Sequence, residues 1–157
     1  MEVTVAMLIA AIAIGITYTV YSIVVRSYGA YNTKNKDMAV LIRLDELLKK
    51  DFEQADLISK SGNHILFKNT DKLVDYNIEP EFTIRISGIT DTFKVTIKDI
   101  NTTFENTPVT GSTEDDEQNR IDELNLTILF EAKTIPYHYH KQYSAASLIQ
   151  RKVNAFN

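Results

Sequence analysis

The N-terminal segment contains an uncharged run that constrains the fold more than any other feature of the chain. No Asp, Glu, Lys or Arg occurs at residues 3–25, whereas Glu2 stands immediately before this run. A helix rises by about 1.5 Å per residue, so a run of this length spans the hydrocarbon layer of a bilayer, which is about 30 Å thick. The run predicts a transmembrane helix with one acidic residue at its start.

Two other interpretations of the run compete with this one. A secretory signal needs a basic leading region, a shorter apolar core and a small-residue cleavage site. Ala11-Ile12-Ala13 resembles such a site but lies in the middle of the run, and no Lys or Arg precedes it. A plain single-span anchor fits the length, but it gives Glu2 no role. An acidic residue at a membrane edge needs no role if it lies in water, so the plain anchor stays open at this point.

Basic residues follow the run, which raises a question of orientation. Tyr18 and Tyr21, near the end of the run, suit the interfacial zone, where an aromatic ring is buried and its hydroxyl group stays in water. Arg26, Lys34 and Lys36 come next, and none of the preceding residues is basic. Taken alone, this asymmetry would place the C-terminal side in the cytoplasm.

Helical periodicity continues beyond the run and becomes amphipathic. Gly29 and the polar residues 32–36 lower helix propensity locally and predict a bend or a softened turn. Gly62 is a natural residue for the turn that ends a helix. We expect one long helix from residue 3 to about residue 58. Its apolar stripe recurs at steps of three and four residues: Tyr21, Val24, Tyr28, Tyr31, Met38, Leu41, Leu44, Leu48, Phe52 and Ala55.

The remaining residues show the alternation that is typical of antiparallel strands. Segments 82–86, 93–97 and 124–130 alternate apolar with polar residues, and each predicts a strand whose apolar residues face the core. Two further strands are expected at 64–68 and 73–78, with loops at 69–71 and 88–91. A sheet with one apolar face needs a partner, and the amphipathic half of the helix supplies it. The predicted fold class is α+β, a long N-terminal helix packed on a small antiparallel sheet.

These patterns divide the chain into three parts and exclude several functions. Residues 1–25 form the transmembrane half of the helix, residues 26–60 its amphipathic half, and residues 61–157 a β domain. The net charge of −4 does not favour nucleic acid as a partner, and the chain contains no cysteine. The nucleophile elbow, the glycine-rich phosphate loop and the zinc-binding His-Glu-x-x-His motif are also missing, so we expect no enzymatic activity.

Two groups of side chains are weak candidates for metal binding. The acidic loop at 114–117, which includes Asp115 and Asp116, offers carboxylates to Ca²⁺ but matches no loop motif of fixed geometry. His138 and His140 would point to the same face of a strand and could share a transition metal, yet no third ligand is indicated. We expect a solvated loop, surface histidines and no cofactor. A metal-dependent enzyme built on the histidines is the weakest alternative.

The order of these elements resembles the type IV pilin-like family. The segment "MEVTVAMLIAAIAIG" places a glutamate directly before a run of Ile, Val, Ala and Leu, and an amphipathic helix and a small sheet follow. The segment "LIRLDELLKKDFEQADLI" is similar to the J-type minor pseudopilins of type II secretion, most closely at residues 50–55. The resemblance implies a single-pass protein of the bacterial inner membrane, with its C-terminal domain in the periplasm. It also implies a structural subunit at the tip of a type II secretion pseudopilus or a type IV pilus-like filament.

The resemblance also implies roles for particular residues and partners. Glu2 would pair with the free N-terminal amine of a neighbouring subunit and so set the register of the filament. The implied partners are other pilin or pseudopilin subunits, the inner-membrane assembly platform, the prepilin peptidase and the lipid bilayer. The membrane and filament-core surface would include five apolar residues of the run: Val3, Leu8, Ile12, Ile16 and Val20.

The chain departs from the family pattern in three respects. The peptidase cleavage motif that precedes the glutamate is not visible, so we expect the basic leader to lie upstream of Met1, where it would also resolve the orientation conflict. The helix lacks the proline that kinks many members, and no cysteine pair closes a C-terminal loop, which favours a pseudopilin over a major pilin. The alternative is a single-span protein whose extracytoplasmic domain binds a ligand or senses it; such a protein would tolerate loss of Glu2.

Overall fold

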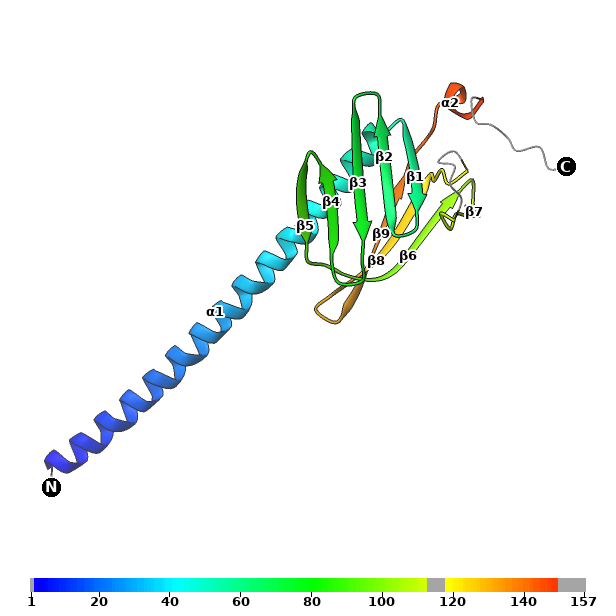
Figure 1. Ribbon diagram of the computed structural model, residues 1–157. Coiled ribbons are helices and arrows are strands. Elements are labelled where there is room, and N and C mark those ends of the chain that lie inside the picture. Colours follow the sequence, from blue (N-terminus) through cyan, green and yellow to red (C-terminus); the bar gives the residue numbers. More distant parts are fainter. Residues whose placement is uncertain (1, 113–117, 150–157) are drawn as a thin grey trace. The chain divides into compact units, whose positions relative to one another are not determined.

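A computed structural model of the chain describes residues 2–112 and 118–149 (Figure 1). It contains one long helix and antiparallel sheets, which confirms the predicted α+β class. The elements in chain order are α1 (Glu2–Gln54), β1 (Leu57–Ser61), β2 (His64–Asn69), β3 (Lys72–Ile78), β4 (Thr83–Ser87), β5 (Ile89–Phe93), β6 (Thr96–Phe104), β7 (Thr107–Pro108), β8 (Glu123–Phe130), β9 (Lys133–His140) and α2 (Ala145–Ile149).

The chain forms two compact units, Met1–Ala39 and Val40–Asn157. The described part of the first unit consists of the N-terminal portion of α1. The second unit contains the last turns of α1 together with all the strands and α2. The boundary thus falls inside a helix, at the point where side chains of α1 begin to be buried.

Helix α1 is unbroken through Gly29 and the polar residues 32–36, where the sequence predicted a bend or a softened turn. It ends at Gln54, so the predicted end near residue 58 was wrong. Asn69 Nδ2 donates to the Gln54 carbonyl at 2.9 Å and Lys141 Nζ to the Glu53 carbonyl at 2.8 Å. These bonds satisfy carbonyl groups that the end of a helix leaves without a partner.

The residues after α1 pair as a strand, and this pairing overrides the helical pattern of the sequence. β1 pairs with β2 in an antiparallel hairpin, and Gly62 lies in its turn at φ 58°. The positive φ explains why glycine occupies this position, although the sequence suggested that Gly62 ends the helix. The predicted strands at 64–68 and 73–78 are confirmed as β2 and β3.

The strands form two antiparallel sheets instead of the single small sheet that we expected. The first has the order β1-β2-β3-β4-β5 and the second the order β7-β6-β8-β9. The predicted strand at 124–130 is confirmed within β8. The predicted strand at 93–97 is divided, because β5 ends at Phe93 and β6 begins at Thr96. The predicted loop at 88–91 is also shorter than expected, since β5 already begins at Ile89.

The last turns of α1 supply the centre of the core, as the apolar stripe predicted. Leu41, Leu44, Leu48 and Phe52 are all buried, and burying an aliphatic or aromatic side chain of this size contributes about 1.5–3 kcal/mol. The Phe52 ring contacts Phe67 of β2 at a centroid distance of 5.2 Å and Tyr139 of β9 at 5.5 Å. The end of α1 therefore packs against both sheets.

Strand β4 faces the opposite way from its predicted orientation. The sequence suggested that Ile84 and Ile86 point into the core, but Thr83 and Arg85 are the buried residues, while Ile86 is 44% exposed. The reason is an ion pair between Arg85 and Asp51 of α1. A buried partner on the helix makes the core side of β4 polar, which an apolar-in rule cannot anticipate.

Candidate membrane and assembly segment

The N-terminal part of α1 exposes an apolar surface along its whole length. Every side chain at residues 3–25 is exposed except the half-buried Ser22. Among the described residues, α1 is the one helix long and apolar enough to cross a membrane by length and composition. Exposed apolar surface of this extent needs lipid or a protein partner to cover it. The five residues predicted to form the membrane and filament-core surface are all more than half exposed: Val3, Leu8, Ile12, Ile16 and Val20.

The polar side chains within this segment are compatible with an apolar environment. Thr17 Oγ1 donates to the Ala13 carbonyl at 2.8 Å, and Thr19 Oγ1 donates to the Gly15 carbonyl at 2.8 Å. A hydroxyl group without a partner is costly to transfer out of water, and such bonds to the preceding turn remove that cost. These threonines therefore leave the segment free to enter lipid or a bundle of helices.

Glu2 lies in the first turn of α1, directly beside this apolar surface. The N-terminus of a helix carries a partial positive charge, which favours a carboxylate there. In water or at a membrane surface the group needs no further partner. Moved into an apolar environment, a carboxylate is stable only when it is paired with a cation or with hydrogen-bond donors. The first turn of α1 can therefore sit at a membrane edge, or it can bind a cation within an assembly.

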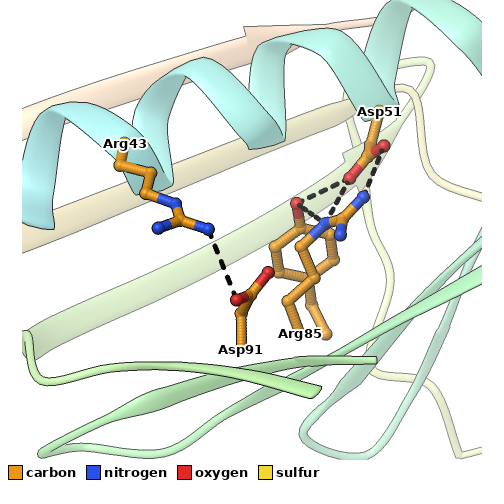
Figure 2. Close-up of polar contacts among 5 residues, drawn as sticks. Arg43, Asp51, Arg85 and Asp91 are labelled. Atoms are coloured by element: carbon orange, nitrogen blue, oxygen red, sulfur yellow. Dashed lines mark hydrogen bonds and ion pairs between the residues drawn. The ribbon is translucent and has the colours of Figure 1, made fainter. Parts of the chain in front are cut away.

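A buried polar cluster joins the last turns of α1 to the first sheet (Figure 2). Arg85 donates two hydrogen bonds to Asp51, from Nε to Oδ2 at 2.8 Å and from Nη2 to Oδ1 at 3.2 Å. The Tyr76 hydroxyl donates to Asp51 Oδ2 at 2.7 Å. A second ion pair, Arg43–Asp91, is more exposed and longer, at 3.4 Å. The cluster fixes one helical turn to strands β3 and β4.

The environment of the cluster shifts the pKa values of Tyr76 and Arg85 in the direction that these bonds need. Burial raises the pKa of Tyr76, and the Asp51 carboxylate raises it further. Burial by itself would lower the pKa of Arg85, but the bonds to Asp51 and the charges around it raise that pKa overall. The arginine therefore stays charged and the tyrosine stays neutral. The sequence did not predict this cluster, and its one signal was that Asp51 directly precedes Phe52, at the edge of the apolar stripe.

The two histidine candidates lie on the exposed face of β9, while Tyr139 between them is buried. His138 Nδ1 lies 2.8 Å from Asn125 Oδ1, and His140 Nδ1 lies 3.7 Å from Glu123 Oε1. Within residues 2–112 and 118–149, no three His, Cys, Asp or Glu side chains are grouped so that they could hold a metal ion. The other candidates, Asp115 and Asp116, lie outside the described residues.

Comparison with protein-family models, curated proteins and solved structures found no match. The resemblance to type IV pilin-like proteins therefore stays a prediction from the sequence. The structure itself defines a coarser class. It is an α+β protein whose one long helix is apolar enough to anchor it in a membrane.

Proposed function

We propose that this protein is a membrane-anchored structural subunit that assembles into a filament through the N-terminal part of α1. The observation that carries the proposal is the combination of a fully exposed apolar helix surface with Glu2 in its first turn. Within the pilin-like resemblance, the subunit is a minor pseudopilin or minor pilin at the filament tip. The proposed location is the bacterial inner membrane, with the second unit in the periplasm.

The apolar surface alone does not decide between lipid and protein as its surroundings. Lipid chains and a helix bundle are both apolar, so moving Leu8, Ile12 and Ile16 from one to the other changes little hydrophobic free energy. A polar group that finds a partner only in the bundle changes this balance. Glu2 is the acidic residue in the first turn of α1, and an ion pair with a neighbouring subunit favours assembly.

The buried cluster supports the same proposal from the other end of the helix. A subunit that leaves the membrane by its helix must carry its folded unit with it. Asp51 and Arg85 tie the last turns of α1 to the first sheet through two charge-assisted hydrogen bonds, which are among the stronger hydrogen bonds in proteins. A displacement of the last turns of α1 is therefore transmitted to the first sheet through this ion pair as well as through the backbone between α1 and β1.

The test is the Glu2→Ala variant, expressed in cells that contain the filament machinery. We expect unchanged membrane insertion, since the apolar run is intact, and loss of filament incorporation by more than about tenfold, because a buried ion pair is removed. Glu46→Ala provides the matched control, since Glu46 is an exposed glutamate of the same helix. Incorporation of Glu2→Ala at the level of the unmodified protein would contradict the proposal.

A second candidate function is supported by a groove in the folded unit. The groove has a volume of about 450 Å³ and is lined by Asp56, Lys141, Tyr143, Ser144 and Ser147 among others. A groove of this size, with both polar and apolar lining, can hold a small ligand, as a membrane-anchored binding or sensor domain would require. Such a protein does not use Glu2 for assembly. If Glu2→Ala causes no defect in cells, this second function is favoured.

A further inference from the structure

The part of α1 at residues 18–36, termed the collar here, carries exposed aromatic and basic side chains. Tyr18, Tyr21, Tyr28 and Tyr31 are between 63% and 72% exposed. The collar also contains Arg26, Lys34 and Lys36, all of which are exposed. It overlaps the end of the uncharged run and extends beyond it.

Three of the four tyrosines of the collar lie on the side of the helix opposite its basic residues, whereas Tyr18 falls on the basic side, at the angle of Lys36. Successive residues of an α-helix are about 100° apart around its axis. With this spacing, Tyr21, Tyr28 and Tyr31 fall on one side. The three basic residues fall on the other side, and Arg26 lies at its centre. One side of the collar thus carries most of its tyrosine side chains, and the other side carries its positive charge.

The charge of the collar is opposite in sign to that of the whole protein. The collar has three basic residues and no acidic residue, whereas the chain carries a net charge of −4. Positive charge is therefore concentrated next to the apolar run, where an anionic surface would meet it.

The basic residues are within reach of a membrane surface if the apolar run spans the bilayer. Arg26 directly follows the run, and Lys36 lies about 15 Å further along the helix axis. Long basic side chains bend back toward headgroups while their methylene groups cover apolar surface. The surface potential of an anionic bilayer extends for a Debye length of about 8–10 Å at moderate salt. All three residues can therefore experience this potential.

We propose that the collar binds the phosphate groups of anionic phospholipids, through Arg26, Lys34 and Lys36. This inference rests on the membrane insertion that the proposed function requires, but not on filament assembly. Tyrosine rings suit the headgroup level of a bilayer. The tyrosine side of the collar therefore helps to hold this part of the helix at that level, and it adds no charge. Lipid phosphate is the source of the ligand, because the adjacent apolar run holds the collar at the membrane surface. The anionic lipid content of the membrane then sets how firmly the subunit is held.

The experiment measures lipid selectivity around the full-length protein. The protein is reconstituted in phosphatidylcholine vesicles that contain a trace of spin-labelled phosphatidylglycerol or spin-labelled phosphatidylcholine. The protein-bound fraction of each probe is then read from electron paramagnetic resonance. We expect the anionic probe to be selected several-fold, since one basic residue near an anionic surface contributes up to about fivefold. Selectivity should fall as salt is raised.

Two variants with the same change of charge separate the collar from the rest of the surface. The collar variant carries Arg26→Gln, Lys34→Gln and Lys36→Gln. The control variant carries Lys94→Gln, Lys98→Gln and Lys133→Gln, which alter exposed lysines of the folded unit. We expect selectivity to be lost in the first variant and kept in the second. Circular dichroism and flotation with the vesicles show that both variants remain helical and inserted.

Three results would overturn the inference. They are equal binding of the two probes by the unmodified protein, selectivity that survives in the collar variant, and selectivity abolished by inorganic phosphate at constant ionic strength. Failure of the unmodified protein to float with vesicles would overturn membrane insertion as well, and with it the proposed function. Loss of selectivity in a protein that inserts leaves filament assembly to be judged by Glu2→Ala, so the two proposals can fail separately.

Discussion

Asp51 lies at the edge of the apolar stripe of α1, on the side that packs against the first sheet. It lies one turn after Leu48 and is 4% exposed, yet it is an acidic residue. Burial of a carboxylate is tolerated here because Arg85 and Tyr76 supply three hydrogen bonds to it. The sequence pattern shows neither that Asp51 is buried nor which residue pairs with it. Arg85 lies far away in sequence, on a strand whose alternation suggests the other face.

Substitution of Asp51 should cost far more stability than substitution of an exposed aspartate on the same helix. Asp51→Asn leaves the Arg85 guanidinium buried without a countercharge, and we expect a loss of about 3–5 kcal/mol in the free energy of unfolding. Asp37→Asn, an exposed change, should alter it by less than about 0.5 kcal/mol. Chemical denaturation of the full chain in detergent measures both. A loss below about 1 kcal/mol for Asp51→Asn would mean that the pair behaves like a surface ion pair.

The two buried tyrosines that face α1 predict how stability depends on alkaline pH. Burial raises the pKa of Tyr76 and of Tyr139, and the neighbouring carboxylates of Asp51 and Asp45 raise both further. A raised pKa in the folded state means that the unfolded chain loses these protons first. The contribution of the two tyrosines to stability should therefore be constant below pH of about 9, and above pH 10 it should fall by about 1.4 kcal/mol per pH unit for each tyrosine. In Tyr139→Phe the slope above pH 10 should be smaller by about 1.4 kcal/mol per pH unit. Equal slopes for the variant and the unmodified protein would refute this assignment.

Helix α1 shows which elements a sequence can specify and which it cannot. Its stripe of Leu41, Leu44, Leu48 and Phe52 was predictable, because one helix face is buried at regular spacing. Its end was not, because residues after Gln54 have a helical pattern but form β1 against β2. The inversion of β4 has a similar cause, since Arg85 is buried by a partner from a distant element. Local periodicity fails where a long-range pairing contributes more free energy than the local pattern.

Two glycines with positive φ, Gly62 in the β1–β2 turn and Gly111 after β7, allow a comparison of two alanine variants. Gly62 and Gly111 both have positive φ, at 58° and 72°, which costs a residue with a side chain about 1–2 kcal/mol. A Cβ at Gly62 would meet nothing within 4 Å, whereas at Gly111 it would lie 2.9 Å from the Lys60 carbonyl oxygen. Gly111→Ala should therefore destabilise the protein more than Gly62→Ala. Denaturation midpoints of the two variants check this order, and the reverse order would contradict the geometry.

At the scale of the whole molecule, one of the two units buries its own apolar core, whereas the other leaves its apolar surface exposed. Val40–Asn157 buries its own core, while the described part of Met1–Ala39 has an exposed surface throughout residues 3–25. The sequence was enough to identify the apolar run and Glu2, because both are local. It could not reveal the groove beside Asp56 and Lys141, which forms only when distant segments fold together. The unit with the exposed apolar surface is the one for which we propose assembly.

Crosslinking within cells tests most directly whether the apolar part of α1 contacts another subunit. The chain has no cysteine, so Ile12→Cys creates a single attachment point for a photocrosslinker in the middle of the run. We predict that, in cells with the filament machinery, the probe forms an adduct with a second helix-bearing subunit, and that adding Glu2→Ala removes this adduct while insertion persists. Adducts with lipid alone, or the same protein adduct with Glu2→Ala present, would contradict the account.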